Sequence, residues 1–347
     1  MQNAIKTDWF KASTKRACAA IETAAPTPHG RARLLPSRPR FDLRLQSHPA
    51  RAAAAVSAIL IALSATAQAQ DSEAQWQAWR AHRAASLAAS NGWTTLIGLV
   101  WLQPGVTHAG GDPTNYALLP PGRAPASVGT FIRDGRAVRF DAAPGANITI
   151  NGQPATSANL VSDANDSPSI VRVGDISIVV IERGERIGLR IRDTQAPTRV
   201  HFHPPDAYPY DVAWRLHAKF EPFLLPKKLK IADVTGNVQE MESPGSLVFN
   251  CGGREYRLDA LTEAGETNFF IIFHDQTAGQ TTYHSGRFLY APKPGPDGGV
   301  TVDFNYAYSP PCAFTPYATC PLPPQENWLP LEVKAGELAP AGHKGRE

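Results

Sequence analysis

The segment FFIIFHDQTAGQTTYHSGRFLY (269–290) places an acid, a phenol and a guanidinium within one short stretch. Its apolar run ends shortly before Asp275, and the chain then returns through Tyr283 and Arg287. Side chains alternate along an extended strand, so Tyr283, Ser285 and Arg287 are predicted on one side of the returning strand. We interpret Asp275 and Arg287 in one of two ways. They form an ion pair that fixes a hairpin and adds little stability if exposed, or they line the mouth of a pocket.

A second cluster of polar residues follows in VDFNYAYSPPCAFTPYATCPLPPQEN (302–327). Asp303 and Asn305 are expected on one face of a strand, and the pair Glu326-Asn327 comes after a proline run. Two separated carboxylates could act as acid and base if burial raised the pKa of one of them. The same side chains could instead satisfy the backbone groups of an irregular, proline-rich coil. The candidate ligand-binding residues are Asp275, Tyr283, Arg287, Asp303, Asn305, Tyr308, Glu326 and Asn327.

The segment PPCAFTPYATCPLPPQEN (310–327), which we call the clasp, contains Cys312 and Cys320. The spacing of these cysteines differs from the Cys-x-x-Cys pattern of thiolate metal sites. In an oxidising compartment a Cys312–Cys320 disulfide is the expected state, and closing this short loop would contribute roughly 2–3 kcal/mol. Two separate buried thiols, or a reactive thiol with His284 as its base, are the alternatives. The state of Cys251 is left open.

His201 and His203 lie two residues apart in an extended stretch and are weak candidates for a metal site. Such a site needs a third ligand, for example His217, His274 or Asp211, to converge on them in space. No phosphate-binding loop, dinucleotide fingerprint or nucleophile elbow is present in the sequence. We therefore predict no cofactor, and we make no prediction of an enzymatic reaction.

The N-terminal part of the chain has the anatomy of a secretory leader. In ARAAAAVSAILIALSATAQAQ, Arg51 precedes an apolar core and Ala67-Gln68-Ala69 forms a small-residue cleavage site. Residues 1–69 carry 10 Lys and Arg against 3 Asp and Glu, which leaves 24 basic and 28 acidic residues in the remainder. The net charge of +3 therefore comes from the leader, and a nucleic-acid-binding surface is not predicted. We expect export to the periplasm or secretion, with cleavage near Ala69 and no transmembrane segment afterwards.

The remaining sequence predicts a mainly β protein. Trp76, Trp79, Arg83 and Leu87 recur at helical spacing, so one short helix is expected over 71–90. After it, short alternating segments are separated by turn signals such as Asp134-Gly135 and Asn151-Gly152. This pattern is typical of two packed modules that resemble β-sandwiches or barrels. The predicted division is a leader over 1–69, an N-terminal β module over 70–200, and a C-terminal β module with the clasp over 201–340.

Six segments together resemble the bacterial domain of unknown function 1684 family, across residues 76–337. They are GWTTLIGLVWLQPG, GGDPTNYALLP, RGERIGLRIRD, YPYDVAWRLHAKF, TYHSGRFLYAP and DFNYAYSPPCAFTPYATCPLPPQENWL. Gly111 and Ser309 depart from the serine and asparagine usual in that family. The order of turns in the first module also faintly resembles a forkhead-associated β-sandwich. The arginine and Ser/His pair that such modules use on phosphothreonine are not visible, so only a shared architecture is implied.

These observations favour an exported protein that binds a small or extended organic ligand in a pocket of the C-terminal module. We expect residues 275–327 to line that pocket, with the clasp as one wall. The alternatives are a hydrolase that uses a carboxylate pair or a metal in the same pocket, with acids drawn from Asp275, Asp303 and Glu326, and a structural envelope protein without an active site.

Overall fold

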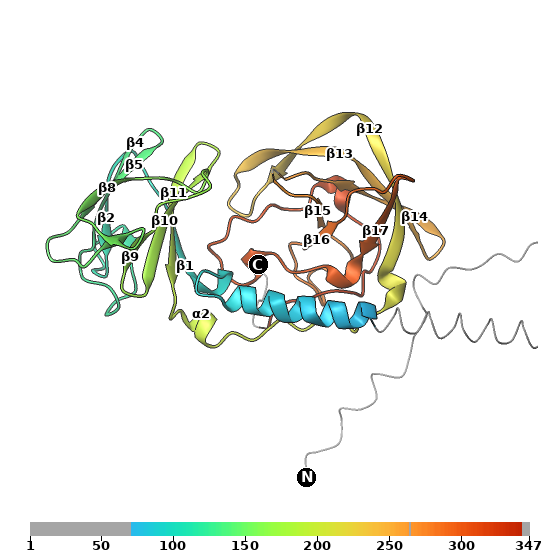
Figure 1. Ribbon diagram of the computed structural model, residues 1–347, viewed down its shortest axis with the longest axis horizontal. Coiled ribbons are helices and arrows are strands. Elements are labelled where there is room, and N and C mark those ends of the chain that lie inside the picture. Colours follow the sequence, from blue (N-terminus) through green and yellow to red (C-terminus); the bar gives the residue numbers. More distant parts are fainter. Residues whose placement is uncertain (1–70, 264, 342–347) are drawn as a thin grey trace, which may run out of the picture.

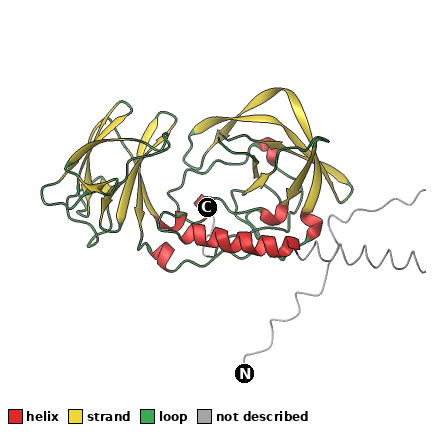
Figure 2. Cartoon of the chain, viewed as in Figure 1, coloured by secondary structure: helices red, strands yellow, loops and turns green. Residues whose placement is uncertain are grey.

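The computed structural model describes residues 71–263 and 265–341. It consists of two β modules, with a helix over residues 71–88 that lies along the C-terminal module and leads into the N-terminal one (Figure 1). Strands dominate both modules, as the sequence predicted (Figure 2). The predicted cleavage site lies outside the described residues. Within those residues no helix has the length and apolar character needed to cross a membrane.

The N-terminal module is a sandwich of a six-stranded and a five-stranded sheet. The six-stranded sheet has the order β1-β11-β10-β9-β6-β7, and the five-stranded sheet has the order β3-β2-β4-β5-β8. Their strands are β1 (Leu96–Trp101), β2 (Gly105–Gly110), β3 (Ala117–Leu118), β4 (Gly129–Asp134), β5 (Ala137–Ala142), β6 (Thr149–Ile150), β7 (Gln153–Pro154), β8 (Ser157–Leu160), β9 (Val171–Val173), β10 (Ile176–Arg183) and β11 (Arg186–Asp193). Alternating side chains such as Phe131, Phe140, Ile178 and Leu189 fill the space between the sheets.

Turn chemistry sets the register of these strands. Asn151 and Gly152 both have positive φ, at 52° and 81°, as a two-residue hairpin loop requires. Gly135, at φ 59°, opens the loop between β4 and β5, where Asp134 pairs with Ala137. The hairpins predicted at these two sites are therefore confirmed.

The C-terminal module packs a four-stranded sheet, in the order β14-β13-β12-β17, against the two-stranded hairpin β15-β16. Its strands are β12 (Arg215–Ala232), β13 (Val238–Cys251), β14 (Arg254–Ala260), β15 (Phe269–Phe273), β16 (Arg287–Ala291) and β17 (Gly299–Asp303). The short helix α2 (Pro197–Val200) precedes them, at the predicted boundary between residues 200 and 201. Short 3₁₀ turns include η1 (Trp93–Thr95), η2 (Val212–Trp214), η3 (Phe304–Tyr306), η4 (Pro311–Ala313) and η5 (Gln325–Asn327).

The hairpin β15-β16 separates two hydrophobic cores. Phe269, Ile271 and Phe273 of β15 face the four-stranded sheet, while Phe270 and Ile272 face a second core that includes clasp residues. All five residues of β15 are therefore buried. This strand carries a continuous apolar run because both of its faces are covered.

The helix of residues 71–88 is held against the C-terminal module by its buried face. Trp76 and Leu87 are each 2% exposed, and the indole Nε1 of Trp76 donates to the carbonyl oxygen of Asn305 at 2.7 Å. The helix ends at residue 88, two residues before the predicted end at residue 90. It therefore presents Trp79 and Arg83 to the same module that it covers.

The clasp connects the two modules. Thr315 donates its hydroxyl to the carbonyl oxygen of Leu96 in β1 at 2.9 Å. The guanidinium Nε of Arg183, at the end of β10, donates to the hydroxyl of Thr319 at 3.2 Å. Both contacts place the clasp against the six-stranded sheet.

Candidate functional site

Asp275 and Arg287 form a fully buried ion pair, with 1% and 0% of their side chains exposed. Arg287 Nη2 lies 3.1 Å from Asp275 Oδ1 and donates to the carbonyl oxygen of Val333 at 2.9 Å, while Nη1 donates to that of Ala335. Asp275 Oδ2 accepts from Thr277 and from the backbone N–H of Val333 at 2.8 Å. The pair thus ties the hairpin β15-β16 to the C-terminal segment, and neither residue lines the pocket described below.

Tyr283 does not share a strand face with Arg287, contrary to the alternation predicted for the returning strand. That strand begins only at Arg287, because a turn that includes Gly286, at φ 91°, comes before it. The buried Tyr283 donates its hydroxyl to the carbonyl oxygen of Cys312 at 3.2 Å, and burial raises the pKa of its phenol. Tyr283 therefore supports the clasp from the second core.

Asp303 and Asn305 also differ from the predicted arrangement, because β17 ends at Asp303 and Asn305 lies in η3. Asp303 caps η3 by accepting from the backbone N–H of Asn305 at 3.1 Å and from its side-chain amide at 2.8 Å. The Asn305 amide also exchanges two hydrogen bonds with the backbone of Asp211. Burial raises the pKa of Asp303.

Glu326 and Asn327 have opposite environments although they are neighbours. Asn327 is fully buried, accepts from the N–H of Asp259 at 2.7 Å, and donates to the carbonyl oxygens of Asp259 and Ile272 at 3.0 and 2.9 Å. Glu326 is exposed in η5. Within the described residues no hydrogen bond or ion pair joins Asp275, Asp303 and Glu326 to one another.

Cys312 and Cys320 are free, buried thiols, so the predicted disulfide is not formed in this structure. The clasp is closed instead by hydrogen bonds, including one from the backbone N–H of Cys312 to Sγ of Cys320 at 3.0 Å. The Cys320 carbonyl oxygen accepts from Val234 at 3.0 Å, which holds the clasp on the loop between β12 and β13. Burial raises the pKa of the Cys320 thiol, which disfavours the reactive thiolate.

His201 and His203 are exposed, and His203 Nδ1 lies 2.8 Å from the carbonyl oxygen of His201. Over the described ranges, no group of three or more His, Cys, Asp and Glu side chains is placed to hold a metal ion. The ring of His203 therefore contacts the backbone of His201, and among the described residues the two histidines have no third ligand beside them.

An open pocket of about 440 Å³ lies between the helix of residues 71–88 and the hairpin β15-β16. Aromatic side chains dominate its walls, and polar groups come from the helix and from the loop before β15. The lining residues are Trp79, His82, Arg83, Ser86, Leu87, Trp93, Glu263, Phe270, Phe288, Tyr290, Tyr308, Pro311 and Pro321. Of the predicted set only Tyr308 lines this pocket, although Pro311 and Pro321 of the clasp contribute to its wall.

The aromatic rings of the pocket contact one another as a connected layer. The ring centroid of Tyr308 lies 5.8 Å from that of Phe288, 6.4 Å from that of Tyr290 and 6.3 Å from that of Trp79. Phe270 packs against Phe288 and Tyr290, with centroids 5.0 and 5.2 Å apart. This layer gives the pocket a rigid, mostly apolar wall.

Two ionic side chains at the pocket have different surroundings. Arg83 is paired with the buried Glu337, and its guanidinium carbon lies 4.4 Å from the ring centroid of Tyr308. Glu263 accepts a hydrogen bond from the hydroxyl of Tyr290 at 3.1 Å. Burial raises the pKa of Glu263 above its ordinary value, and burial together with the neighbouring Glu263 raises the pKa of Tyr290 to about 12.

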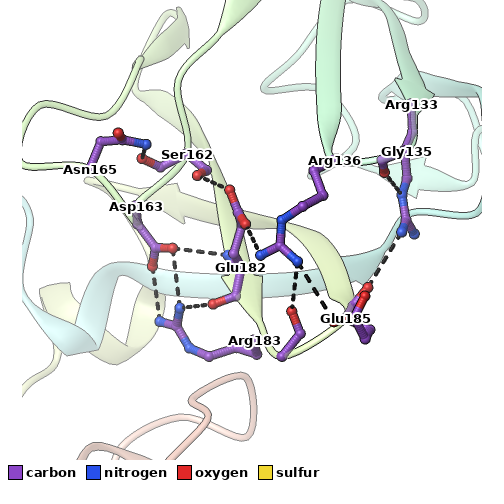
Figure 3. A network of polar contacts seen from close by, with 10 residues as sticks. Arg133, Gly135, Arg136, Ser162, Asp163, Asn165, Glu182, Arg183 and Glu185 are labelled. Atoms are coloured by element: carbon purple, nitrogen blue, oxygen red, sulfur yellow. Dashed lines mark hydrogen bonds and ion pairs between the residues drawn. The ribbon is translucent and has the colours of Figure 1, made fainter.

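Several charged groups of the N-terminal module pair with one another. Arg136 pairs with Glu182, which also accepts from Ser162, and Arg183 forms two hydrogen bonds with Asp163 at 3.1 and 2.9 Å (Figure 3). This network fixes the segment after β8 to the hairpin β10-β11. It offers a ligand no uncompensated group comparable to Glu263.

Sequence reasoning missed Glu263, Trp93 and His82 as pocket residues. Glu263 lies in the irregular loop TEAGETN, which has no periodicity that could indicate a site. The available signal was on the helix, where Trp79 and Arg83 share one face of an alanine-rich segment. An arginine and a tryptophan on the packing face of this helix indicated that polar and aromatic groups lie between the helix and the C-terminal module.

Fold and site together define a two-module β protein whose C-terminal module forms an aromatic pocket with an N-terminal helix. Residues 200–338 match a family described as protein of unknown function (DUF1684), the family that the sequence resemblance predicted. The matched region includes Glu263, Phe270, Tyr290 and Tyr308. The helical residues of the pocket lie outside it. A search of curated proteins finds no match.

Several solved structures share similarity with parts of the chain. An uncharacterized protein from gene locus rrnAC0354 of Haloarcula marismortui, solved by solution NMR, is 29% identical, covers 42% of this chain and 81% of its own, and has a TM-score of 0.36. Two forkhead-associated domain structures, one of them the FhaA domain in a complex and the other from a study of phosphothreonine-dependent interactions, are each 14% identical. Each covers 27% of this chain and 97% or 92% of its own, with a TM-score of 0.20. At these TM-scores none of the three supports an argument about fold or function.

Proposed function

We propose that this protein binds a small or extended organic ligand in the pocket between the helix of residues 71–88 and the hairpin β15-β16. The observation that carries the proposal is the pocket itself, about 440 Å³ in volume and lined by six aromatic side chains. Ligand sites in proteins have volumes of about 300–1,000 Å³ and combine apolar walls with a few polar groups. The pocket has both properties.

The exposure of its wall also supports a binding role. Tyr290 is 40% exposed even though it belongs to a strand whose other residues are buried. A large aromatic side chain on a concave surface gains free energy when a ligand displaces water from its face. A purely structural wall would gain more from being covered by the protein itself.

We propose further that the protein is exported. The support is the sequence of the leader, in which Arg51, an apolar core and Ala67-Gln68-Ala69 occur in the order of a secretory signal. Sequencing the N-terminus of the natively expressed protein tests this proposal. We expect the mature chain to begin at Gln70, and a mature chain that retains residues of the apolar core would contradict it.

The binding proposal is tested by a screen with a matched pair of variants. A library of aromatic and aliphatic fragments is screened against the wild-type protein by saturation-transfer NMR. Ser86→Phe places a bulky ring at an exposed helix position that lines the pocket, and Ala85→Phe places the same ring at the neighbouring exposed position outside it. Both positions are exposed, so both variants are expected to fold with stability within about 0.5 kcal/mol of the wild type.

We expect hits that bind the wild type and Ala85→Phe but no longer bind Ser86→Phe. Hits that bind all three proteins equally would place binding elsewhere and would contradict the proposal. A library without hits for the wild type would favour a structural role for the aromatic layer.

A further inference from the structure

The charges that line the pocket are not balanced. Arg83 is compensated, since its Nε and Nη2 donate to the two carboxylate oxygens of Glu337 and Nη2 also donates to the carbonyl oxygen of Ser309 at 2.7 Å. Glu337 is 3% exposed, so this pairing is closed to solvent on the carboxylate side. Glu263, by contrast, has no ion-pair partner among the residues that the structure describes. A ligand in the pocket therefore meets one uncompensated carboxylate.

The aromatic wall favours the same sign of charge. The face of an aromatic ring attracts cations through its quadrupole. The face of Tyr308 already holds the guanidinium of Arg83, at 4.4 Å from the ring centroid. In the described part of the chain no lysine or arginine stacks on Phe270, Phe288 or Tyr290. Phe270 and Phe288 are buried behind the wall, and Tyr290, 40% exposed, is the ring of these three that a ligand cation can reach.

From this geometry we infer that the ligand is an organic cation whose charge is carried by a methylated nitrogen, held between the carboxylate of Glu263 and the aromatic layer. A primary ammonium group needs three hydrogen-bond acceptors. The pocket offers rings and one uncompensated anionic acceptor, which suits a tertiary or quaternary ammonium better. This inference rests on the proposed ligand-binding function, and it adds the chemical class of the ligand.

The environment of Glu263 is consistent with this class. Partial burial raises the pKa of this carboxyl group, so its ionised form is disfavoured when the pocket holds only water. Tyr290 donates a hydrogen bond to it at 3.1 Å and holds it at the wall. A bound cation would supply the countercharge that the protein itself does not provide.

The test uses three probes of nearly the same shape and different charge, titrated calorimetrically into the full-length protein. The probes are choline, its neutral tert-butyl analogue, and the tert-butylacetate anion. We expect choline to bind at least about tenfold more tightly than the neutral analogue, a difference of about 1.4 kcal/mol, and the anion to bind most weakly.

Two variants then assign the charge effect to one residue. Glu263→Gln keeps the shape and the hydrogen bond from Tyr290 but removes the charge, and we expect choline affinity to fall about tenfold. The neutral analogue should bind this variant as it binds the wild type. Glu266→Gln removes the same charge from the same loop at an exposed position outside the pocket, so choline affinity should stay within about twofold of the wild type.

The possible outcomes separate this inference from the proposed function. Equal binding of choline and its neutral analogue, lost in Ser86→Phe, would overturn the cation inference and leave the pocket as a ligand site. Tightest binding of the anion would also overturn it. If no probe binds, the inference is wrong, and the fragment screen alone decides whether the pocket binds ligands. Equal losses of choline affinity in Glu263→Gln and Glu266→Gln would show a long-range charge effect and contradict the assigned contact.

Discussion

The two faces of the hairpin β15-β16 use polar side chains in opposite ways. On one face Arg287 points into the core of the C-terminal module, where its guanidinium donates hydrogen bonds to Asp275 and to two backbone carbonyl oxygens. On the other face Tyr290 meets Glu263 at an open pocket. Arg287 and Tyr290 are three residues apart on one strand, so the alternation of side chains places them on opposite faces.

This difference is the reason for placing the proposed ligand site on the face that carries Tyr290 and Glu263. In the sequence, Asp275 and Arg287 are easier to recognise as candidate site residues than Glu263 is. In the structure, however, the two residues form their ion pair and hydrogen bonds with other groups of the protein. Glu263 is less conspicuous, and its carboxylate retains capacity for a further partner. A charged group that the fold leaves without a countercharge is therefore a better indicator of a binding site than a charged group in a recognisable pair.

The largest expected effect comes from breaking the buried pair. Arg287→Met leaves the carboxylate of Asp275 buried without its cation, and we expect the free energy of unfolding to fall by about 3–5 kcal/mol. Urea unfolding followed by circular dichroism measures this change. The double variant Asp275→Asn with Arg287→Met has no uncompensated charge, so it should lose less stability than Arg287→Met alone. A loss below about 1 kcal/mol in the single variant would contradict the structural role assigned to the pair.

The adjacent residues Glu326 and Asn327 offer a sharper test of the same comparison. Asn327→Ala removes three hydrogen bonds and leaves backbone groups of Asp259 and Ile272 unsatisfied, so it should lower the free energy of unfolding by about 1–3 kcal/mol. Glu326→Ala changes an exposed side chain and should stay within about 0.5 kcal/mol of the wild type. Thermal and urea unfolding of both variants measure the difference. Equal effects would show that burial does not separate the roles of the two residues.

Much of the fold could be predicted from local sequence signals. Gly135 and the pair Asn151-Gly152 predicted hairpins because few other residues adopt positive φ, and Trp76 and Leu87 marked the buried face of the helix. These signals are local, so one sequence suffices to interpret them. The ion pair between Asp275 and Arg287 was one of the two interpretations that the sequence predicted. This signal is also local, because the two residues flank one hairpin.

The pocket could not be predicted in this way, because its walls come from distant parts of the chain. Tyr308 was recognised as a candidate, but its neighbours Trp79 and Glu263 come from the helix and from an irregular loop. Sequence patterns did not show that the helix would pack beside β16. The polar residues of 275–327 were instead assigned to a pocket. Asparagine and acidic side chains are required both by a ligand site and by a proline-rich coil with buried backbone groups, so their presence in the sequence does not distinguish the two.

The contact between the modules predicts a smaller effect. Thr315→Val keeps the volume of this buried side chain but removes the hydrogen bond from its hydroxyl to the carbonyl oxygen of Leu96. We expect a loss of about 0.5–1.5 kcal/mol, since one neutral hydrogen bond is removed. Differential scanning calorimetry measures it. The exposed Thr267→Val is the control, and it should change stability by no more than about 0.5 kcal/mol.

The smallest expected change in stability is at Glu263, and its dependence on pH distinguishes the two faces of the hairpin. Burial, together with the charge of Glu266, raises the folded-state pKa of Glu263 above the ordinary value of 4.5, while the hydrogen bond from Tyr290 opposes this shift. The folded protein therefore holds this proton more tightly than the unfolded chain, and wild-type stability falls as pH rises from below the ordinary pKa through the raised one. Glu263→Gln cannot titrate and lacks that fall. At neutral pH the variant should be as stable as the wild type or slightly more stable, within about 0.5 kcal/mol.

Urea unfolding of both proteins across acidic to neutral pH measures the difference, which should grow with pH and then level off. A variant that loses stability at neutral pH would place Glu263 among the structural carboxylates, with Asp275, and would remove the distinction between the two faces.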